Sequence, residues 1–236
     1  MSSAINQVMT QVEHFMEINS IGKNYKNGTA TVNAIKNMDF YIDDGEFVTI
    51  MGESGSGKST LLSVLGALNH PSMGKLLIDS MDIYKLSTEQ RADFRSEYIG
   101  FVFQSFQLVP YLNVIENVEL PMAVTGIKKK KQNQMAMDVL KIVGLEQKAH
   151  RLPGQLSGGE QERVAIARAI VNKPPLILAD EPTGNLDSNT AKEIMQLLKS
   201  LNRDGHTIIM VTHNQEMSDY SSRTINLVDG EILASC

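Results

Sequence analysis

A chain of 236 residues, with 42% hydrophobic and 21% charged side chains, can bury the core of one α/β domain, and its composition excludes a disordered or fibrous protein. The formal net charge of −5 argues against a basic, nucleic-acid-binding surface. The only cysteine, Cys236, cannot form an internal disulfide, which fits a reducing compartment.

We find no transmembrane segment and no signal peptide in the sequence. The unbroken apolar runs, such as Val164–Ala167 and Leu176–Ala179, are far shorter than the roughly 18 residues that a bilayer crossing needs. The N-terminal stretch lacks the basic start and the continuous apolar core of a signal peptide. We therefore expect a cytoplasmic protein with no direct membrane insertion, which reaches a membrane only through a partner.

The expected elements begin with a weakly helical N-terminal extension, residues 1–14. A single domain then spans residues 15–236. Its first part, residues 15–50, is strand-like, with alternating apolar residues in the stretch 30–42 and a further strand at 46–51. These strands predict an antiparallel β subdomain that packs against a main sheet.

After a glycine-rich loop, the pattern predicts a helix at 59–68 and strands at 75–79 and 99–103. Helical spacing then follows at 114–124 and 132–143, interrupted by prolines and glycines. The segment 105–158 is therefore predicted to be an inserted α-helical subdomain.

Helices and apolar strands alternate in the remainder of the chain. The expected helices cover 160–171 and 190–201, and the expected strands cover 176–179, 207–211 and 224–227. This βαβ order predicts a mostly parallel sheet with helices on both faces, and hence the α/β class.

The strongest motif is the run Gly52–Ser59, a complete match to G-x-x-x-x-G-K-[ST] between a predicted strand and a predicted helix. Its glycines let backbone N–H groups point at phosphate oxygens, and the helix start adds positive partial charge. Lys58 offers an ammonium to the outer phosphates, and Ser59 a hydroxyl for Mg²⁺. The alternative, a glycine-rich turn that binds nothing, is disfavoured between a strand and a helix. The nucleotide-binding residues expected here are Gly52, Glu53, Ser54, Gly55, Ser56, Gly57, Lys58, Ser59 and Thr60.

Two carboxylates, Asp180 and Glu181, stand at the end of a predicted buried strand, where open α/β sheets bind their ligands. Asp180 is suited to hold Mg²⁺, directly or through water, and Glu181 to polarise the water that attacks the γ-phosphate. Alone, such a pair is usually structural, but the upstream phosphate loop favours catalysis.

A second candidate anion site is the segment Leu156–Glu160, LSGGE, which directly precedes a predicted helix. Alone, it would be an ordinary serine cap. The longer string LSGGEQERVAIARAI, however, resembles the signature of ABC ATPases. The strings TGNLD (Thr183–Asp187) and MVTH (Met210–His213) resemble the D-loop and the histidine switch of that family.

Further positions match the same family. Gln104, at the end of the predicted strand FVFQ, matches its glutamine loop, and Tyr25 and Val32 match the aromatic that stacks on adenine and its apolar neighbour. The resemblance runs from about residue 16 to the end, with every motif in order. Glu160 and Glu162 depart from it, because many members carry glutamine at both positions.

The resemblance implies a P-loop NTPase core of the ABC ATPase type, with ATP and Mg²⁺ as cofactors. It implies that Lys58, Glu181 and His213 are catalytic, His213 sensing the γ-phosphate and orienting Glu181 and water. A lone histidine after an apolar strand is otherwise more often structural. The implied Mg²⁺ ligands are Ser59, Gln104 and Asp180. The implied nucleotide contacts outside the phosphate loop are Tyr25, Val32, Gln104, Ser157, Gly158, Gly159, Glu160, Asp187 and His213.

The resemblance also implies partners. ATP on the phosphate loop of one chain would be capped by the signature of a second copy, in an ATP-dependent head-to-tail homodimer. A separate integral-membrane permease would hold this dimer on the inner face of the cell membrane. No nucleic-acid partner is expected.

Two long stretches, IGFVFQSFQLVPYLNVIENVELPMAVTG and ILADEPTGNLDS, are similar to the bacterial group that serves macrolide export, lipoprotein release and antimicrobial-peptide resistance. The alternative is the cell-division ATPase of the same subfamily, which regulates wall hydrolases through a membrane partner. A DNA-repair ATPase would need a coiled coil or zinc insertion between Lys58 and Ser157, and an ABC translation factor would need a second cassette. The sequence has neither.

Overall fold

The fold is seen in a computed structural model, which describes residues 14–28 and 30–233. The expected N-terminal extension lies outside the described residues except for His14. The strands are β1 (Met16–Asn27), β2 (Ala30–Ile42), β3 (Phe47–Met51), β4 (Met73–Ile78), β5 (Met81–Asp82), β6 (Ile99–Val102), β7 (Leu176–Asp180), β8 (Thr207–Thr212), β9 (Arg223–Val228) and β10 (Glu231–Leu233). The α-helices are α1 (Lys58–Leu65), α2 (Thr88–Tyr98), α3 (Val114–Glu119), α4 (Lys129–Ile142), α5 (Gly158–Ile170), α6 (Ser188–Arg203) and α7 (Gln215–Ser218).

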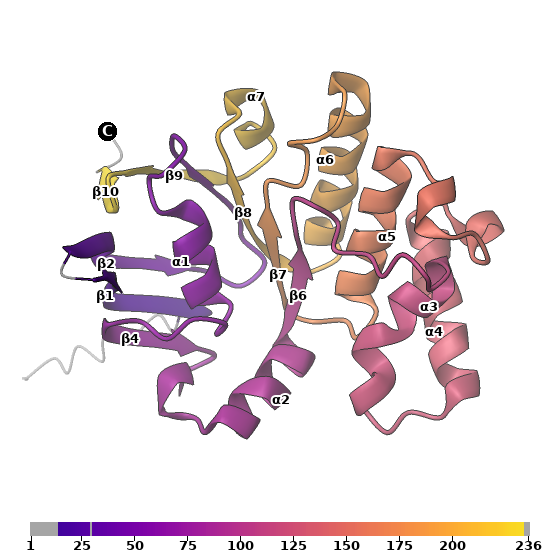
Figure 1. The fold of residues 1–236 in the computed structure, drawn as a ribbon, viewed down its shortest axis with the longest axis horizontal. Coiled ribbons are helices and arrows are strands. Elements are labelled where there is room, and N and C mark those ends of the chain that lie inside the picture. The colour runs from indigo at the N-terminus through magenta and orange to yellow at the C-terminus, as the bar shows by residue number, and fades with distance from the viewer. Residues whose placement is uncertain (1–13, 29, 234–236) are drawn as a thin grey trace, which may run out of the picture.

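The strands form two sheets (Figure 1). The smaller sheet is antiparallel, in the order β2-β1-β4-β5. The larger sheet has the order β10-β9-β3-β8-β7-β6, with parallel pairing throughout except for the antiparallel pair of β9 and the edge strand β10. The expected α/β class, with a mostly parallel main sheet and an N-terminal antiparallel β region, is therefore confirmed.

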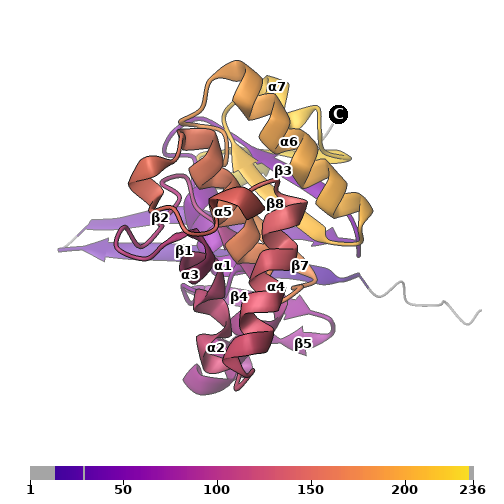
Figure 2. The ribbon, with the colours of Figure 1, turned by 90° about the vertical axis from the view of Figure 1, so that its right-hand side faces the viewer.

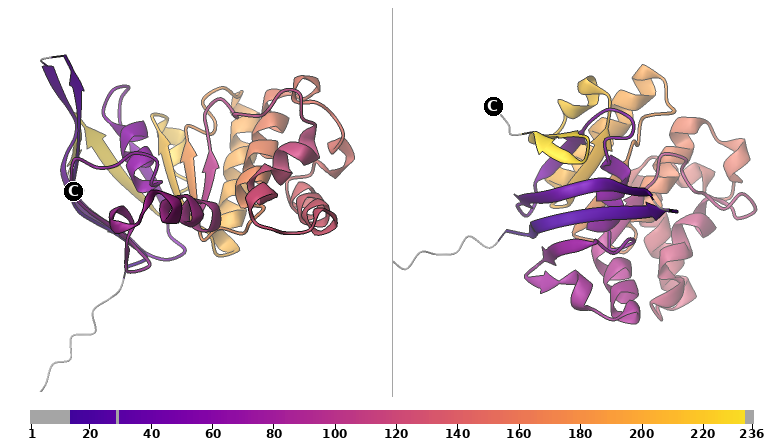
Figure 3. Two further views of the ribbon diagram at one scale, coloured as in Figure 1. Left: turned by 60° about the horizontal axis from the view of Figure 1, so that its bottom comes forward. Right: turned by 60° about the vertical axis from the view of Figure 1, so that its left-hand side comes forward.

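Side-chain alternation along the parallel strands creates two apolar cores. In β7, Leu176 and Leu178 pack on the side of α1 and the antiparallel sheet, whereas Ile177 and Ala179 pack on the side of α3 to α6. This is the period of two that a strand buried on both faces requires. Figure 3 shows the resulting layers: antiparallel sheet, α1, parallel strands, then the helices α3 to α6. Figure 2 views the helical side, with α4 and α5 in front of the strands.

The helices α3 and α4 lie within the expected helical subdomain and pack with α5 in one apolar core. The predicted helix at 114–124 is divided, however. An α-helix ends at Glu119 and a 3-10 helix covers Leu120–Val124, because Pro121 has no N–H to continue the i→i−4 hydrogen bonds. The boundaries of the subdomain remain a prediction.

Gln104 does not end a strand, as its sequence context had suggested. Strand β6 stops at Val102, and the N–H of Phe106 donates to the carbonyl of Phe103 at 2.9 Å, so that Gln104 lies in a turn. The predicted helix at 59–68 is likewise shorter and ends at Leu65, before Gly66. Helix α2 was not predicted, because its residues are mostly charged or polar and only Phe94 is buried.

Candidate nucleotide-binding site

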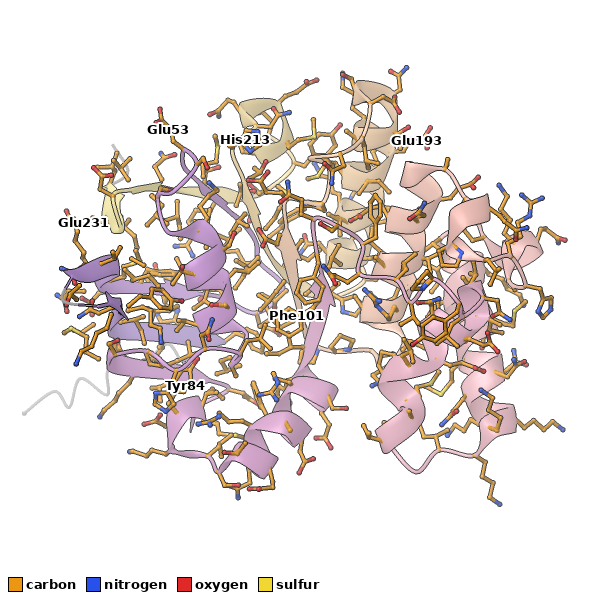
Figure 4. The ribbon with its side chains drawn as sticks, in the orientation of Figure 1. Glu53, Tyr84, Phe101, Glu193, His213 and Glu231 are labelled. Atoms are coloured by element: carbon orange, nitrogen blue, oxygen red, sulfur yellow. The ribbon has the colours of Figure 1, made fainter. Side chains whose placement is uncertain are left out.

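A cleft of about 1000 Å³ opens along the phosphate loop, at the carboxyl ends of the parallel strands. Figure 4 shows Glu53 of that loop and His213, which follows β8, at the same edge of the molecule. The residues that line the cleft are Val32, Asn33, Ala34, Lys36, Glu53, Ser54, Gly55, Gly57, Lys58, Ser59, Thr60, Gln104, Glu181, His213, Asp229 and Gly230.

The phosphate loop leaves the start of α1 open towards the cleft. Gly57 precedes the helix with a φ of 103°, and a Cβ there would lie 2.4 Å from the carbonyl oxygen of Ala34. Only glycine fits this backbone and this close approach. Within the described residues no side chain caps α1, so its first amides remain available to an anion.

Lys58 is held inside the loop that it serves. Its side chain is buried, and its Nζ donates to the carbonyls of Gly52 and Glu53, both at 2.8 Å. The ammonium is therefore fixed at the wall of the cleft by two neutral carbonyl oxygens. A phosphate group in the cleft would complete its coordination.

Asp180 and Ser59 meet at the end of β7, where the hydroxyl of Ser59 donates to Oδ1 of Asp180 at 3.2 Å. Burial raises the pKa of Asp180 above its ordinary value against the pull of this hydrogen bond, and the neighbouring Glu181 raises it further. A cation would stabilise the carboxylate that burial disfavours. Carboxylate, hydroxyl and amide oxygens are also the ligands that Mg²⁺ prefers, so the expected donor set of Ser59, Asp180 and Gln104 fits this ion.

Glu181 directly follows β7 with a φ of 45°. Its N–H donates to Val211 and its carbonyl accepts from Gly184, both at 3.0 Å. Left-handed backbone at a non-glycine residue is costly and is characteristic of functional sites. The Oε2 atom of Glu181 lies 2.9 Å from Nδ1 of His213. The structure therefore brings together the two residues that the sequence had assigned to water activation and phosphate sensing.

Gln104 lies beside this pair. A Cβ added to Gly184 would lie 3.2 Å from Nε2 of Gln104 and 3.4 Å from Oε2 of Glu181, so both side chains approach the same point of the backbone. The carbonyl of Gln104 also accepts a hydrogen bond from the side chain of Asn185 at 2.9 Å.

The signature residues form a second helix start, at α5. Ser157 caps the helix in a reciprocal capping box with Glu160. The side chain of Lys148 binds Glu160 and lowers the pKa of its carboxyl. Among the described residues, the cleft lining includes none of the signature residues Ser157, Gly158, Gly159 and Glu160. A single chain therefore presents the two expected phosphate contacts on separate surfaces.

Of the remaining expected nucleotide contacts, some line the cleft and others lie outside its lining. Val32 lines the cleft and pairs with Tyr25 across β1 and β2; the ring of Tyr25 is half exposed, with Nζ of Lys23 at 5.1 Å from its centroid. Asp187 lies outside the cleft lining and caps α6, accepting from the N–H of Thr190 at 3.1 Å. Gly52, Ser56, Tyr25 and Asp180 are also outside the lining.

Five lining residues were not predicted from the sequence. They are Asn33, Ala34, Lys36, Asp229 and Gly230. The Asp229-Gly230 pair is a typical turn sequence. Its closeness to the phosphate loop, however, is a tertiary contact: the N–H of Gly230 donates to the carbonyl of Ser56 at 3.0 Å.

Comparison with known proteins assigns the family. A family model described as ABC transporter matches residues 35–184. An ABC transporter ATP-binding protein of Thermotoga maritima is 46% identical over 217 residues, which cover 92% of this chain and 93% of that protein. The macrolide export ATP-binding/permease protein MacB of Escherichia coli is 43% identical over 223 residues; these cover 94% of this chain but 34% of MacB. The chain thus spans about a third of MacB.

Solved structures agree with this assignment. The dimeric structure of MJ0796, an ABC transporter cassette of Methanocaldococcus jannaschii, matches with a TM-score of 0.86 and 45% identity, over 93% of this chain and 97% of that one. A dimeric post-hydrolysis state of MJ0796 bound to ADP and Pi matches equally well. Across residues 14–28 and 30–233, no helix has the length and apolar character to cross a membrane. The chain belongs to the ABC transporter family and is an ATP-hydrolysing cassette of that family.

Proposed function

We propose that this cassette dimerises head to tail around two ATP molecules and uses their hydrolysis to drive a membrane permease in export or extraction of a macrolide, lipoprotein or antimicrobial peptide. The observation that carries this proposal is the division of the site. The cleft contains Lys58, Glu181 and His213, whereas the signature at Ser157 lies outside it.

The roles follow from the chemistry of the cleft. Lys58 and the first amides of α1 bind the β- and γ-phosphates, exchanging neutral carbonyl partners for anionic oxygens. Glu181 accepts the proton of the attacking water. His213 holds the Glu181 carboxylate through the contact of 2.9 Å and senses the γ-phosphate from its exposed position. Val32 and Tyr25 take the adenine.

The residues that would hold Mg²⁺ are Ser59, Asp180 and Gln104. An Mg²⁺ ion held by these residues would neutralise charge on the β- and γ-phosphates. Burial of Asp180, which raises its pKa, supports this assignment because a carboxylate in such surroundings favours a cation as neighbour.

The dimer explains the second helix start. The amides at the beginning of α5 carry positive partial charge, which a γ-phosphate on the other subunit would neutralise. MJ0796, whose solved cassette is dimeric, supports the same arrangement here. Loss of the γ-phosphate removes the attraction and allows the dimer to open.

The transport role and the location at the membrane rest on relatives. MacB is by name both an ATP-binding and a permease protein for macrolide export. We therefore place this cassette in the cytoplasm, held at the inner face of the cell membrane by its permease, and working in the direction of export.

The replacement Glu181→Gln tests the central assignment. The amide keeps the shape of the side chain but cannot accept the proton, so hydrolysis should fall by at least ~10²-fold. ATP should still bind and should trap a dimer, seen by light scattering as a doubled mass. Glu193→Gln, on the exposed face of α6, is the matched control and should keep the native rate. A near-native rate in Glu181→Gln would remove Glu181 as the base.

A further inference from the structure

The loop 103–107, which carries Gln104, has an unusual backbone. Phe106 and Gln107 have φ values of 60° and 51°, so two successive residues with side chains adopt the left-handed conformation. Such residues avoid this region unless their surroundings impose it. The turn formed by the loop does not supply that constraint alone, because its internal bonds join only Phe106 to Phe103 and Gln107 to Ser105.

The constraint comes from Arg168, near the end of α5. Its guanidinium donates from Nη2 to the carbonyl of Phe106 at 2.7 Å and from Nη1 to the carbonyl of Gln107 at 2.5 Å. One planar fork thus holds two neighbouring carbonyls in a fixed relative orientation. A lysine could not reproduce this geometry, because its ammonium is a single point donor.

Helix α5 also contacts the loop at its other end. The ring of Phe106 lies next to the signature, since a Cβ added to Gly158 would be 4.0 Å from Cζ of Phe106. One helix therefore carries the signature at its start and the support of the glutamine loop near its end. A shift of α5 would therefore move both the signature and the loop 103–107.

Arg168 is a largely buried charged donor, which strengthens this support. Burial lowers the pKa of Arg168, and Glu162 acts against that effect. Glu162 is itself fully buried, and neither of its carboxyl oxygens has a hydrogen-bond partner among the described residues. The hydrogen bonds of Arg168 with the described residues are the two to Phe106 and Gln107. Charge-assisted bonds of this kind are stronger than bonds between neutral groups.

We propose that Arg168 is a positioning residue for Gln104: it fixes the loop 103–107 to the signature helix, so that the Gln104 amide and the signature move together. The proposal rests on the role given to Gln104 in the proposed function. Asn185 supports the same loop from the D-loop, through the carbonyl of Gln104.

The test compares Arg168→Lys and Arg168→Met with Arg163→Lys as the control. Arg163 also lies on α5 and donates to a carbonyl, that of Val143, as well as to Glu193 on α6 (Figure 4), but it does not contact the loop. The first measurement is amide hydrogen exchange of residues 103–108 in nucleotide-free protein. We expect about tenfold faster exchange in Arg168→Lys, the loss of one charge-assisted hydrogen bond, and a larger increase in Arg168→Met.

The second measurement is the Mg²⁺ concentration for half-maximal hydrolysis, together with calorimetric ATP affinity in EDTA. We expect several-fold more Mg²⁺ to be required and kcat to fall, with ATP affinity in EDTA unchanged, because the phosphate loop is untouched. Gln104→Ala is measured in parallel and should show the same loss of Mg²⁺ response.

Unchanged exchange and Mg²⁺ response in both Arg168 variants, with a clear loss in Gln104→Ala, would overturn the inference and leave the proposed function intact. An equal increase of exchange in Arg163→Lys would overturn it too, because the effect would then be a general loosening of α5. If Gln104→Ala keeps a native Mg²⁺ response, the glutamine has no metal role and the inference falls with it. Should Arg168→Met fail to fold, Arg168→Lys alone decides.

Discussion

Glu160 and Glu162 lie two positions apart in α5, and their surroundings differ. Glu162 is fully buried, whereas Glu160 is partly exposed and binds the side chain of Lys148. Burial raises the pKa of Glu162 to about 8. The Lys148 side chain lowers the pKa of Glu160. Because the folded protein binds the proton of Glu162 more tightly than the unfolded chain, Glu162 lowers the free energy of unfolding as the pH rises from about 4.5 to about 8. Glu160 acts in the other direction, and its contribution is lost as the pH falls through its folded-state pKa.

We therefore expect Glu162→Gln to stabilise the fold at and above neutral pH. The gain should be small near pH 5, should grow to roughly 3–5 kcal/mol at pH 8 and should then stay constant. Urea unfolding at a series of pH values measures it. Glu160→Gln is the matched control and should lower stability at neutral pH. Parallel stability curves for wild type and Glu162→Gln would show that the Glu162 carboxyl is not shifted.

The helices that start at the two expected phosphate contacts are built differently. Helix α1 begins after Gly57 and has no side-chain cap within the described residues, whereas α5 begins with the capping box of Ser157 and Glu160. The free amides of α1 suit a ligand that the chain itself binds. The capped start of α5 is already stable without ligand and can serve as a surface for a second subunit.

Gly57→Ala tests the geometry of the α1 start without changing any charge. The added Cβ would meet the carbonyl oxygen of Ala34 at 2.4 Å and would force an unfavourable φ, so we expect a loss of about 1–3 kcal/mol in stability and at least ~10-fold weaker ATP binding, measured by calorimetry. Gly154→Ala is the control, because Gly154 has open space around it and no positive φ. Native ATP affinity in Gly57→Ala would contradict the description of the loop as a preformed phosphate site.

At the scale of the whole molecule, the phosphate loop and the signature belong to opposite sides of the central sheet. Helix α1 packs in the apolar core beside the antiparallel sheet, and α5 packs in the other core with α3, α4 and α6. In the proposed head-to-tail dimer, each chain would contribute one half of each of two sites, and a complete site would require a second copy.

A mixed dimer tests this sharing. One copy carries Lys58→Ala and the other Gly158→Asp, whose carboxylate should repel the γ-phosphate. Position 158 suits the change because a Cβ there meets only ordinary contacts at 3.4 Å or more, whereas a Cβ at Gly159 would lie 2.3 Å from the Thr190 methyl group. Each homodimer has both sites damaged. The mixed dimer combines both lesions in one site and leaves the other intact, so we expect one trapped ATP per dimer.

The matched control is the homodimer of the double variant Lys58→Ala, Gly158→Asp, which should trap no ATP. Trapped nucleotide is counted after rapid gel filtration, in a mixed dimer verified by mass. Absence of any trapped ATP in the verified mixed dimer would defeat the shared-site model.

The sequence by itself determined the features that depend on residues adjacent in the chain. The glycine-rich loop, the two acids after an apolar strand and the LSGGE segment are contiguous, and their chemistry follows from backbone freedom and helix starts. The alternation of apolar strands and helices along the chain likewise predicted a mostly parallel sheet covered on both faces. Element ends were less accurate, as at β6, because a turn bond between Phe103 and Phe106 ends the strand.

The tertiary structure alone decided what depends on residues far apart in the chain. The contact between Glu181 and His213, the approach of Ala34 and Gly230 to the phosphate loop, and the fork of Arg168 on the loop of Gln104 all join separate elements. The burial of Glu162 also depends on tertiary structure, because segments distant in the sequence pack around it and exclude solvent. Packing creates these contacts, because the local preferences of a segment specify its own backbone but not its neighbours in space.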